Sequence, residues 1–191
     1  DTGDQYIYHN LETDPHELGD DVEGAIACLL WDIYDSHNDG RDVLSLGISN
    51  IWDVFNKYKV SGHNVYNIHE FWDGWFSRGH DYAHEMWGIF YDHGINKDTN
   101  PPSNPTHYFS DPPANVWSNR NTVYVTWYGA SDSLSGVNGY WYRWTKDTYG
   151  DPTGHNYTTG TSITRQLSDG IWYLNIRSRD NAGNNAQGYV Y

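Results

Sequence analysis

The spacing of hydrophobic residues changes about halfway along the chain. In the first half they recur every three or four residues, as between Val22 and Ile33, which predicts helices that each bury one face. In the second half the spacing shortens to two, which predicts short strands whose side chains alternate between two faces. We therefore expect a multidomain chain of mixed class, with an α-helical domain followed by an antiparallel β domain.

Four amphipathic segments predict helices in the first half, over about residues 22–33, 49–59, 67–79 and 81–94. Asn67 is a good N-cap, and Glu70 stands at the capping-box position three residues later. Gly94 is a typical residue to follow the last helical turn. In the second segment, Trp52 and Phe55 are expected to face the core.

The second half contains short alternating runs separated by Gly, Asn, Asp and Ser, an arrangement typical of an antiparallel sandwich. Within the run after Ile171, the alternation places Asn175 and Arg177 on a face that we expect to meet water. The predicted strands are Thr122–Trp127, Gly139–Trp144, Ser162–Leu167, Ile171–Ile176 and Gly188–Tyr191.

Charge divides the chain at the same place as hydrophobic spacing. Residues 1–98 hold 19 acidic and 5 basic side chains, whereas residues 99–191 hold 6 of each. Between the halves lies the segment TNPPSNP, which cannot continue a helix because proline lacks an amide donor. We therefore expect an acidic helical domain over 1–98, a Pro/Asn linker over 99–109 and a β-sandwich over 110–191.

The composition excludes several classes of protein. A net charge of −14 disfavours binding to nucleic acids and to anionic membranes, because both depend on clustered Lys and Arg. No apolar run reaches the roughly 18 residues that a membrane span needs. The single cysteine, Cys28, excludes an internal disulfide, and its apolar neighbours predict that it is buried.

Three stretches of the second half, SGVNGYWYRW (135–144), LSDGIWYLNI (167–176) and DNAGN (180–184), resemble fibronectin type III-like and bacterial Ig-like modules. The resemblance covers about residues 110–191. In the second of these stretches the aromatic residue that alternates with the inward-facing positions is Trp172, one position earlier than the tyrosine corner of a typical fibronectin type III module. Tyr173 is therefore not assigned the tyrosine-corner role. The resemblance implies a spacer or adhesive unit of an exported or cell-surface prokaryotic protein, and hence an extracellular location.

The first half, through VEGAIACLLWDIYD (22–35), IWDVF (51–55) and IHEFWDGW (68–75), resembles the C-terminal helical part of secreted zincin-like metallopeptidase homologues. Zincins need His-Glu-x-x-His to hold zinc and activate water, and this chain lacks it. The nearest sequence, from His16 to Asp20, has aspartate in place of the second histidine. We expect no catalytic residues in this chain; the metal-binding half either lies upstream in a longer precursor or has been lost.

Two acidic loops are candidates for calcium, which prefers oxygen ligands. The first carries Asp35, Asp39 and Asp42, but its twelfth position is Leu46 rather than the glutamate of an EF-hand. The second is the Ser131–Gly136 turn, which contains Asp132. A solvated turn is the alternative interpretation of both loops.

Two further positions are candidates for ligand binding or modification. His80 and His84 are four residues apart, a spacing that can hold zinc if a third ligand completes the site. The alternative is that they are polar residues at the start of a helix. Asn156 begins an Asn-Tyr-Thr sequon, a candidate N-glycosylation site.

These observations predict a secreted or cell-surface structural or adhesive protein without catalytic activity of its own. Because sheet edges can pair with another chain, it could assemble with itself or another surface protein into a layer or filament. One alternative is the C-terminal portion of a secreted zinc metallopeptidase. Another is a carbohydrate-binding module that uses exposed Trp and Tyr. Trp31, Trp72 and Trp75 are candidates because they lie beside acidic residues, although the helical spacing of the tryptophans favours core packing.

Overall fold

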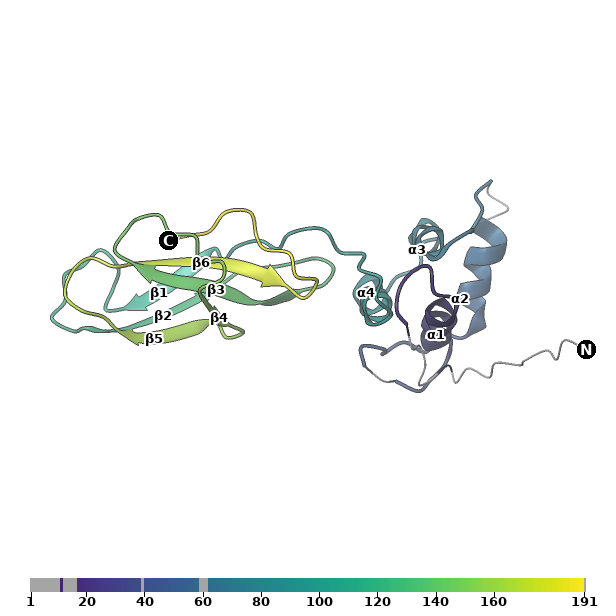
Figure 1. The fold of residues 1–191 in the computed structure, drawn as a ribbon, viewed down its shortest axis with the longest axis horizontal. Helices are drawn as coiled ribbons and strands as arrows, with labels where there is room; N and C mark the ends of the chain where they lie inside the picture. Colours follow the sequence, from purple (N-terminus) through teal and green to yellow (C-terminus); the bar gives the residue numbers. More distant parts are fainter. Residues whose placement is uncertain (1–10, 12–16, 39, 59–61, 191) are drawn as a thin grey trace, which may run out of the picture. The chain divides into compact units, whose positions relative to one another are not determined.

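The computed structural model describes residues 11, 17–38, 40–58 and 62–190. The chain divides between Lys97 and Asp98 into two compact units. The first unit is helical, and the second consists of antiparallel sheets (Figure 1). The mixed α and β class is thereby confirmed. No helix in the described part of the chain combines the length and the apolar character that crossing a membrane requires.

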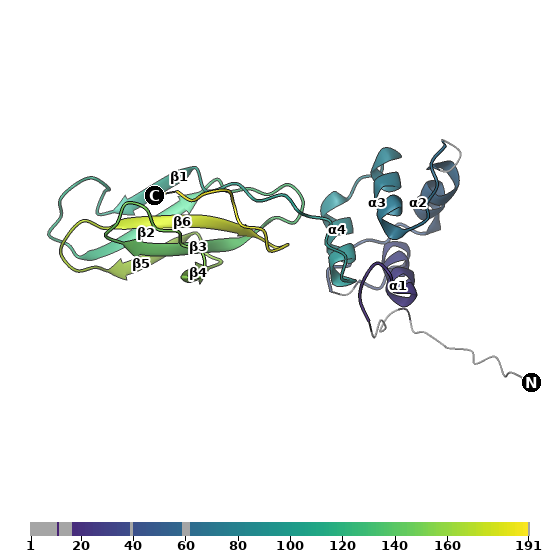
Figure 2. The same ribbon diagram turned by 45° about the horizontal axis from the view of Figure 1, so that its top comes forward.

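Helices of the first unit pack around one apolar core. Both ribbon views show these helices as a group of short elements (Figures 1 and 2). Each helix contributes residues spaced three or four apart, as the amphipathic pattern predicts. Fully buried members include Leu29, Phe71, Trp75 and Phe90. The helices are α1 (Glu23–Tyr34), α2 (Ile48–Asp53), the π-helical segment η1 (Val54–Tyr58), α3 (Ile68–Ser77) and α4 (Ala83–Asp92).

The predicted helix ends at Asn67 and Gly94 are confirmed. The Asn67 side chain accepts a hydrogen bond from the Glu70 N–H at 2.9 Å. The Glu70 carboxylate reaches back to the N–H of Tyr66, one residue before the cap, at 2.5 Å. Gly94 has a φ of +80°, and Ile95 donates to the Phe90 carbonyl at 2.8 Å, so the last turn of α4 is closed by a left-handed residue.

The prediction that Trp52 faces the core is wrong, whereas Phe55 lies at the edge of the core. Trp52 is 62% exposed and Phe55 is 37% exposed, whereas Ile51 and Val54 are buried. Trp52 is exposed because it comes one residue after Ile51, about 100° further around α2, and so lies away from the side that Ile51 and Val54 share. Ile51 and Val54, three residues apart, point into the core, and the Phe55 ring packs on the buried Phe71 with centroids 5.3 Å apart.

The second unit contains two sheets of three strands each, and every strand pair is antiparallel. One sheet has the order β1-β2-β5 and the other β4-β3-β6, and both contribute to one hydrophobic cluster around Val125, Trp127, Tyr140 and Ile176. The strands are β1 (His107–Asp111), β2 (Thr122–Tyr128), β3 (Val137–Thr145), β4 (Asn156–Thr158), β5 (Ser162–Gln166) and β6 (Tyr173–Asp180).

Four of the five predicted strands are confirmed as β2, β3, β5 and β6, with ends that differ by at most four residues. The predicted strand at the C-terminus is not a strand in the described residues; there, Val190 forms an isolated bridge with Ile176. Strands β1 and β4 were not predicted. In the segment 99–109, predicted as a linker, Ser103 donates to the Ser131 carbonyl at 2.8 Å and β1 begins at His107, so this segment lies along the second unit.

The expectation that Asn175 and Arg177 meet water is wrong for Asn175, which is fully buried. Arg177 extends along the same face of β6 and donates to the Ala186 carbonyl at 2.7 Å and to the Thr153 hydroxyl at 3.0 Å. Thr153 lies in the β3–β4 loop and Ala186 in the segment after β6. Because these two segments cover this face of β6, alternation along β6 does not separate an apolar face from a solvated one.

Candidate metal centre

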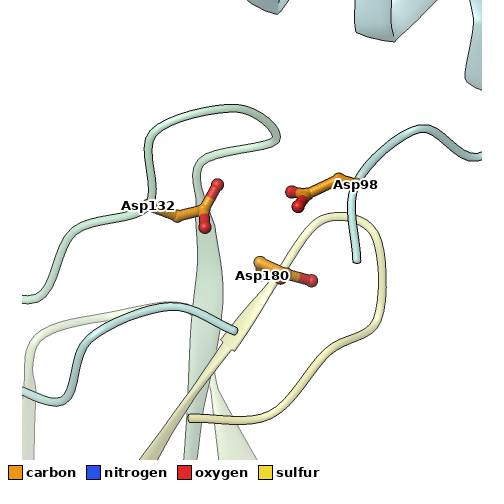
Figure 3. Close-up of side chains that lie close together, drawn as sticks. All are labelled: Asp98, Asp132 and Asp180. Atoms are coloured by element: carbon orange, nitrogen blue, oxygen red, sulfur yellow. The ribbon is translucent and has the colours of Figure 1, made fainter. Parts of the chain in front are cut away.

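Three aspartates of the second unit converge at one end of its sheets (Figure 3). Asp98 precedes β1, Asp132 lies between β2 and β3, and Asp180 ends β6. One carboxylate oxygen of each lies within 4.8 Å of those of the other two. Two oxygens that bind one calcium ion at about 2.4 Å can be at most about 4.8 Å apart, so the group has the dimensions of a shared site.

Asp132 is fixed by the turn that follows it. Its Oδ1 accepts hydrogen bonds from the N–H of Leu134 at 3.0 Å and of Gly136 at 2.8 Å, and from the Ser135 hydroxyl at 3.4 Å. Gly136 has a φ of +77°, a conformation that favours glycine. These three hydrogen bonds to Oδ1 hold the Asp132 carboxylate against its own turn.

Asp98 and Asp180 are held by backbone donors from the neighbouring segments. Asp98 Oδ2 accepts from the Ser135 N–H at 3.1 Å, and Asp98 Oδ1 accepts from the Asn100 N–H at 3.0 Å. Asp180 Oδ1 accepts from the Asn184 N–H at 2.7 Å. Each carboxylate is therefore positioned by hydrogen bonds before any ligand arrives.

The group is electrostatically unfavourable without a compensating positive charge. Asp98 and Asp180 are 0% and 1% exposed, and Asp132 is partly buried. Burial raises the pKa of the Asp180 carboxyl above its ordinary value, although the hydrogen bonds from Asn184 oppose this shift. The negative charges of Asp98 and Asp132 raise that pKa further. A proton or a cation bound among the three groups would relieve the repulsion.

The chemistry of the donors selects the kind of cation. All three side chains offer carboxylate oxygens, and neither histidine nor cysteine belongs to the group. Oxygen-only sites suit hard cations such as calcium and magnesium rather than zinc. Calcium fits better, because it accepts irregular geometry with six to eight ligands at about 2.3–2.6 Å, whereas magnesium needs a tight octahedron.

One member of this group was already a calcium candidate from the sequence. Asp132 was a candidate in the Ser131–Gly136 turn, whereas Asp98 and Asp180 were not proposed as ligands. The signal for Asp180 was present in the DNAGN stretch, which forms the tight turn after β6. Grouping the three residues required knowing that their segments meet at one end of the sheets, which spacing along the sequence does not reveal.

The predicted calcium loop of Asp35, Asp39 and Asp42 remains a prediction, because Asp39 lies outside the described residues. Asp35 is the C-cap residue that follows α1, and its Oδ1 accepts from the His37 N–H at 3.2 Å. Asp42 is buried, and its Oδ1 accepts from the Leu44 N–H at 3.1 Å. These bonds are of the kind that aspartate makes in turns without a metal.

The histidines proposed for zinc have other contacts in the structure. The Nε2 atom of His80 lies 3.2 Å from an Asp53 carboxylate oxygen, and its ring packs on Trp75. The ring of His84 stacks near Trp87. Among the described residues, neither histidine belongs to a group of three that could bind a metal. A zinc site at this pair stays a prediction.

Two remaining positions from the sequence are located by the structure. Asn156 is exposed at the start of β4, and its side-chain amide donates to the Tyr142 carbonyl at 3.3 Å. Asp20, which stands where a zincin has its second histidine, lies 2.6 Å from the Nε2 of His69. His16 lies outside the described residues.

Comparison with known proteins gives a partial match. No family model matches the chain, and no curated protein matches it. Among solved structures, chitinase ChiA74 from Bacillus thuringiensis is similar, with 27% sequence identity and a TM-score of 0.33. The match covers 56% of this chain and 16% of that chain. The chain thus spans a small part of the chitinase's length.

Proposed function

We propose that this chain is a non-catalytic, exported structural or adhesive protein whose second unit is stabilised by calcium. In this proposal the second unit is an immunoglobulin-like or fibronectin type III-like sandwich. The ion binds Asp98, Asp132 and Asp180, and joins the segment before β1 to the β2–β3 loop and the end of β6. The observation that carries the proposal is the convergence of three carboxylates, two of them buried, from three separate segments.

Calcium suits an extracellular location, which is also part of the proposal. Extracellular calcium modules bind the ion with Kd values of about 10⁻⁴–10⁻³ M, a range that requires no complete cage of protein ligands. Three carboxylates supply at most six oxygens, some of which already accept hydrogen bonds, so water completes the shell. The ion would act on stability and shape, because it would join three separate segments of the second unit.

Self-assembly is the second element of the proposed function. Strands β1 and β5 are the outer strands of one sheet, and β4 is an outer strand of the other. Outer strands carry unpaired backbone groups that can bind a strand of another copy. Sedimentation velocity at increasing protein concentration tests this element: larger species support it, and a constant monomer contradicts it.

Thermal unfolding with and without calcium tests the metal site. Calcium at about one hundred times its Kd should stabilise the folded state by about 2.7 kcal/mol, which raises Tm by several degrees. Magnesium should give a smaller rise. Asp180→Asn should abolish the calcium effect, while in the absence of divalent cations it should be at least as stable as the wild type, because it removes one of three clustered charges.

Asp169→Asn is the matched control. Asp169 is an exposed aspartate of the same unit, in the β5–β6 loop and outside the carboxylate group. This variant should keep the full calcium response. If calcium leaves the Tm of the wild type unchanged, or raises that of Asp180→Asn equally, the metal site is excluded.

A further inference from the structure

The outward face of the β1-β2-β5 sheet carries exposed aromatic rings. Along β2, Val125 and Trp127 point into the hydrophobic cluster, so Tyr124, Thr126 and Tyr128 point outward. Tyr124 is 40% exposed and Tyr128 is 60% exposed. Both lie on the central strand of the sheet, with β1 on one side and β5 on the other (Figure 1).

Strand β1 extends this set of rings. Phe109 pairs with Thr126 and is 59% exposed, so it lies diagonally between Tyr124 and Tyr128. Diagonal neighbours on one face of a sheet are about 7–8 Å apart. His107 pairs with Tyr128, and the two rings stack with centroids 4.5 Å apart and planes 5° from parallel. We call the rings of Tyr124, Phe109, Tyr128 and His107 the aromatic stripe.

Hydrogen-bonding side chains accompany the aromatic stripe on its other side. Strand β5 pairs Thr164 with Tyr124, Ser162 with Thr126 and Gln166 with Thr122, so all of these side chains share the outward face. The three β5 residues are exposed. A row of rings on β1 and β2 therefore runs beside a row of hydroxyl and amide groups on β5.

The outward face carries almost no net charge. Of the outward residues in the described strands β1, β2 and β5, Asp111 is the only acid, and none is Lys or Arg. Arg120, from the following loop, donates to Asp111 Oδ2 at 3.0 Å and neutralises it. A highly charged ligand would find no complementary charge here.

We infer that the aromatic stripe binds an uncharged polysaccharide. A pyranose ring has apolar C–H faces, which stack on the electron-rich faces of aromatic rings, and a rim of hydroxyl groups, which bind hydroxyl and amide side chains. The outward face offers both in adjacent rows and little charge. An extended polysaccharide can lie along the stripe and contact several rings at once. This inference concerns a different surface from the calcium site and does not depend on it.

The aromatic residues proposed here differ from those that the sequence suggested. Trp75 is fully buried in the core of the first unit, and Trp72 packs against that core. Tyr124 and Tyr128, by contrast, alternate with core residues along one strand, and their outward direction follows from that alternation. The carbohydrate-binding hypothesis therefore moves from the helices to the sheet.

Binding of the full chain to insoluble cellulose and chitin, and to soluble mannan by affinity electrophoresis, tests the inference. We expect binding to at least one of these uncharged polysaccharides, with little dependence on salt. Phe109→Thr, Tyr124→Thr and Tyr128→Thr should each weaken it about tenfold, the scale of one aromatic contact. Threonine is chosen because it keeps the preference of these positions for strand structure.

Tyr149→Thr is the matched control, because Tyr149 is 71% exposed and lies in the β3–β4 loop, outside the aromatic stripe. It should bind as the wild type does, and circular dichroism should show all four variants folded. Absence of binding to every uncharged polysaccharide overturns the inference. It is also overturned if Tyr149→Thr weakens polysaccharide binding as much as the variants of the aromatic stripe do. Preferential, salt-sensitive binding to anionic alginate, or a dimer that Tyr128→Thr dissociates without any polysaccharide binding, also overturns it.

The same measurements keep this inference separate from the proposed calcium site. Asp180→Asn, assayed without divalent cations at a temperature where it is folded, should still bind polysaccharide. If calcium does not stabilise the protein but polysaccharide binding is retained, only the proposed calcium site is contradicted. A calcium response without polysaccharide binding removes only the inference about the aromatic stripe.

Discussion

Asn184 donates two hydrogen bonds to the carboxylate of Asp180, from its backbone N–H to Oδ1 at 2.7 Å and from its side-chain amide to Oδ2 at 2.9 Å. The same side-chain amide donates to the carbonyl oxygen of Asp98 at 3.1 Å. Asn184 therefore holds together two of the three segments that carry the candidate metal ligands. These hydrogen bonds give Asn184 the place of a positioning residue for the proposed metal site.

Asn184→Ala should weaken calcium binding and destabilise the second unit. Loss of the side-chain donor leaves the buried Asp180 Oδ2 and the Asp98 carbonyl without this partner, which costs about 1–3 kcal/mol. Isothermal titration should show calcium affinity about tenfold lower, because the carboxylates are less well positioned. Asn119→Ala, at an exposed loop position of the same unit, should change neither quantity. Unchanged affinity in Asn184→Ala would contradict the positioning role.

The stability of the metal-free protein should depend on pH through Asp180. Its pKa is raised in the folded state above the ordinary value of 3.8, so between these two values the folded state holds more protons than the unfolded state. This contribution to stability is present below the ordinary pKa and is lost as the pH rises through the raised pKa. Calcium should reduce the loss, because the cation replaces the proton as the balancing charge.

The difference in unfolding free energy between the wild type and Asp180→Asn, measured as a function of pH, separates the contribution of Asp180 from those of the other carboxylates. Unfolding free energies of the wild type and of Asp180→Asn would be compared from roughly pH 3 to roughly pH 7 after removal of divalent cations. The wild type should lose stability relative to the variant as the pH rises. A difference that does not change with pH, or that has the opposite sign, would show that the pKa of Asp180 is not raised.

Local patterns predicted those elements whose ends are determined by neighbouring residues. The cap at Asn67 and the left-handed residue Gly94 depend on backbone groups within a few positions, so the sequence around them was sufficient. The short strand β4 was missed because its three residues are too few to show alternation. Trp52 was misplaced because being apolar does not decide which side of a helix a residue faces: it lies about 100° around α2 from the buried Ile51.

The candidate site could be predicted only in part for a similar reason. Asp132 stands in a turn that local chemistry makes recognisable, since its own loop supplies donors to Oδ1. Asp98 and Asp180 are 82 positions apart in the sequence, and their proximity depends on the path of every strand between them. The outward direction of Tyr124 and Tyr128 was implicit in the alternation along β2, but their exposure depends on what covers that face.

Paired tryptophan variants should separate core packing from surface exposure in the first unit. Trp75 is fully buried, and its indole N–H donates to the Asp81 carbonyl at 2.9 Å, whereas Trp52 is 62% exposed. Trp75→Ala should cost about 3–5 kcal/mol, because it opens a cavity and removes that donor. Trp52→Ala should stay within about 0.5 kcal/mol of the wild type. Urea unfolding would measure both, and equal costs would contradict the burial seen here.

The buried pair of Asp32 and His93 should stabilise the contact between α1 and the end of α4. Asp32 Oδ2 lies 2.7 Å from His93 Nε2, and both side chains are largely buried. His93 Nδ1 has no hydrogen bond in the described part of the chain, so Asp32→Ala would leave neither ring nitrogen with a partner. We expect a loss of about 1–3 kcal/mol in urea unfolding, the cost of an unsatisfied buried polar group. Asp32→Asn should lose less, because its amide oxygen can still accept from Nε2.

Asp73→Ala is the control, because Asp73 lies at an exposed position of α3 and this variant should change stability little. A loss of stability as large as that of Asp32→Ala would mean that general charge effects, not the pair, determine the result.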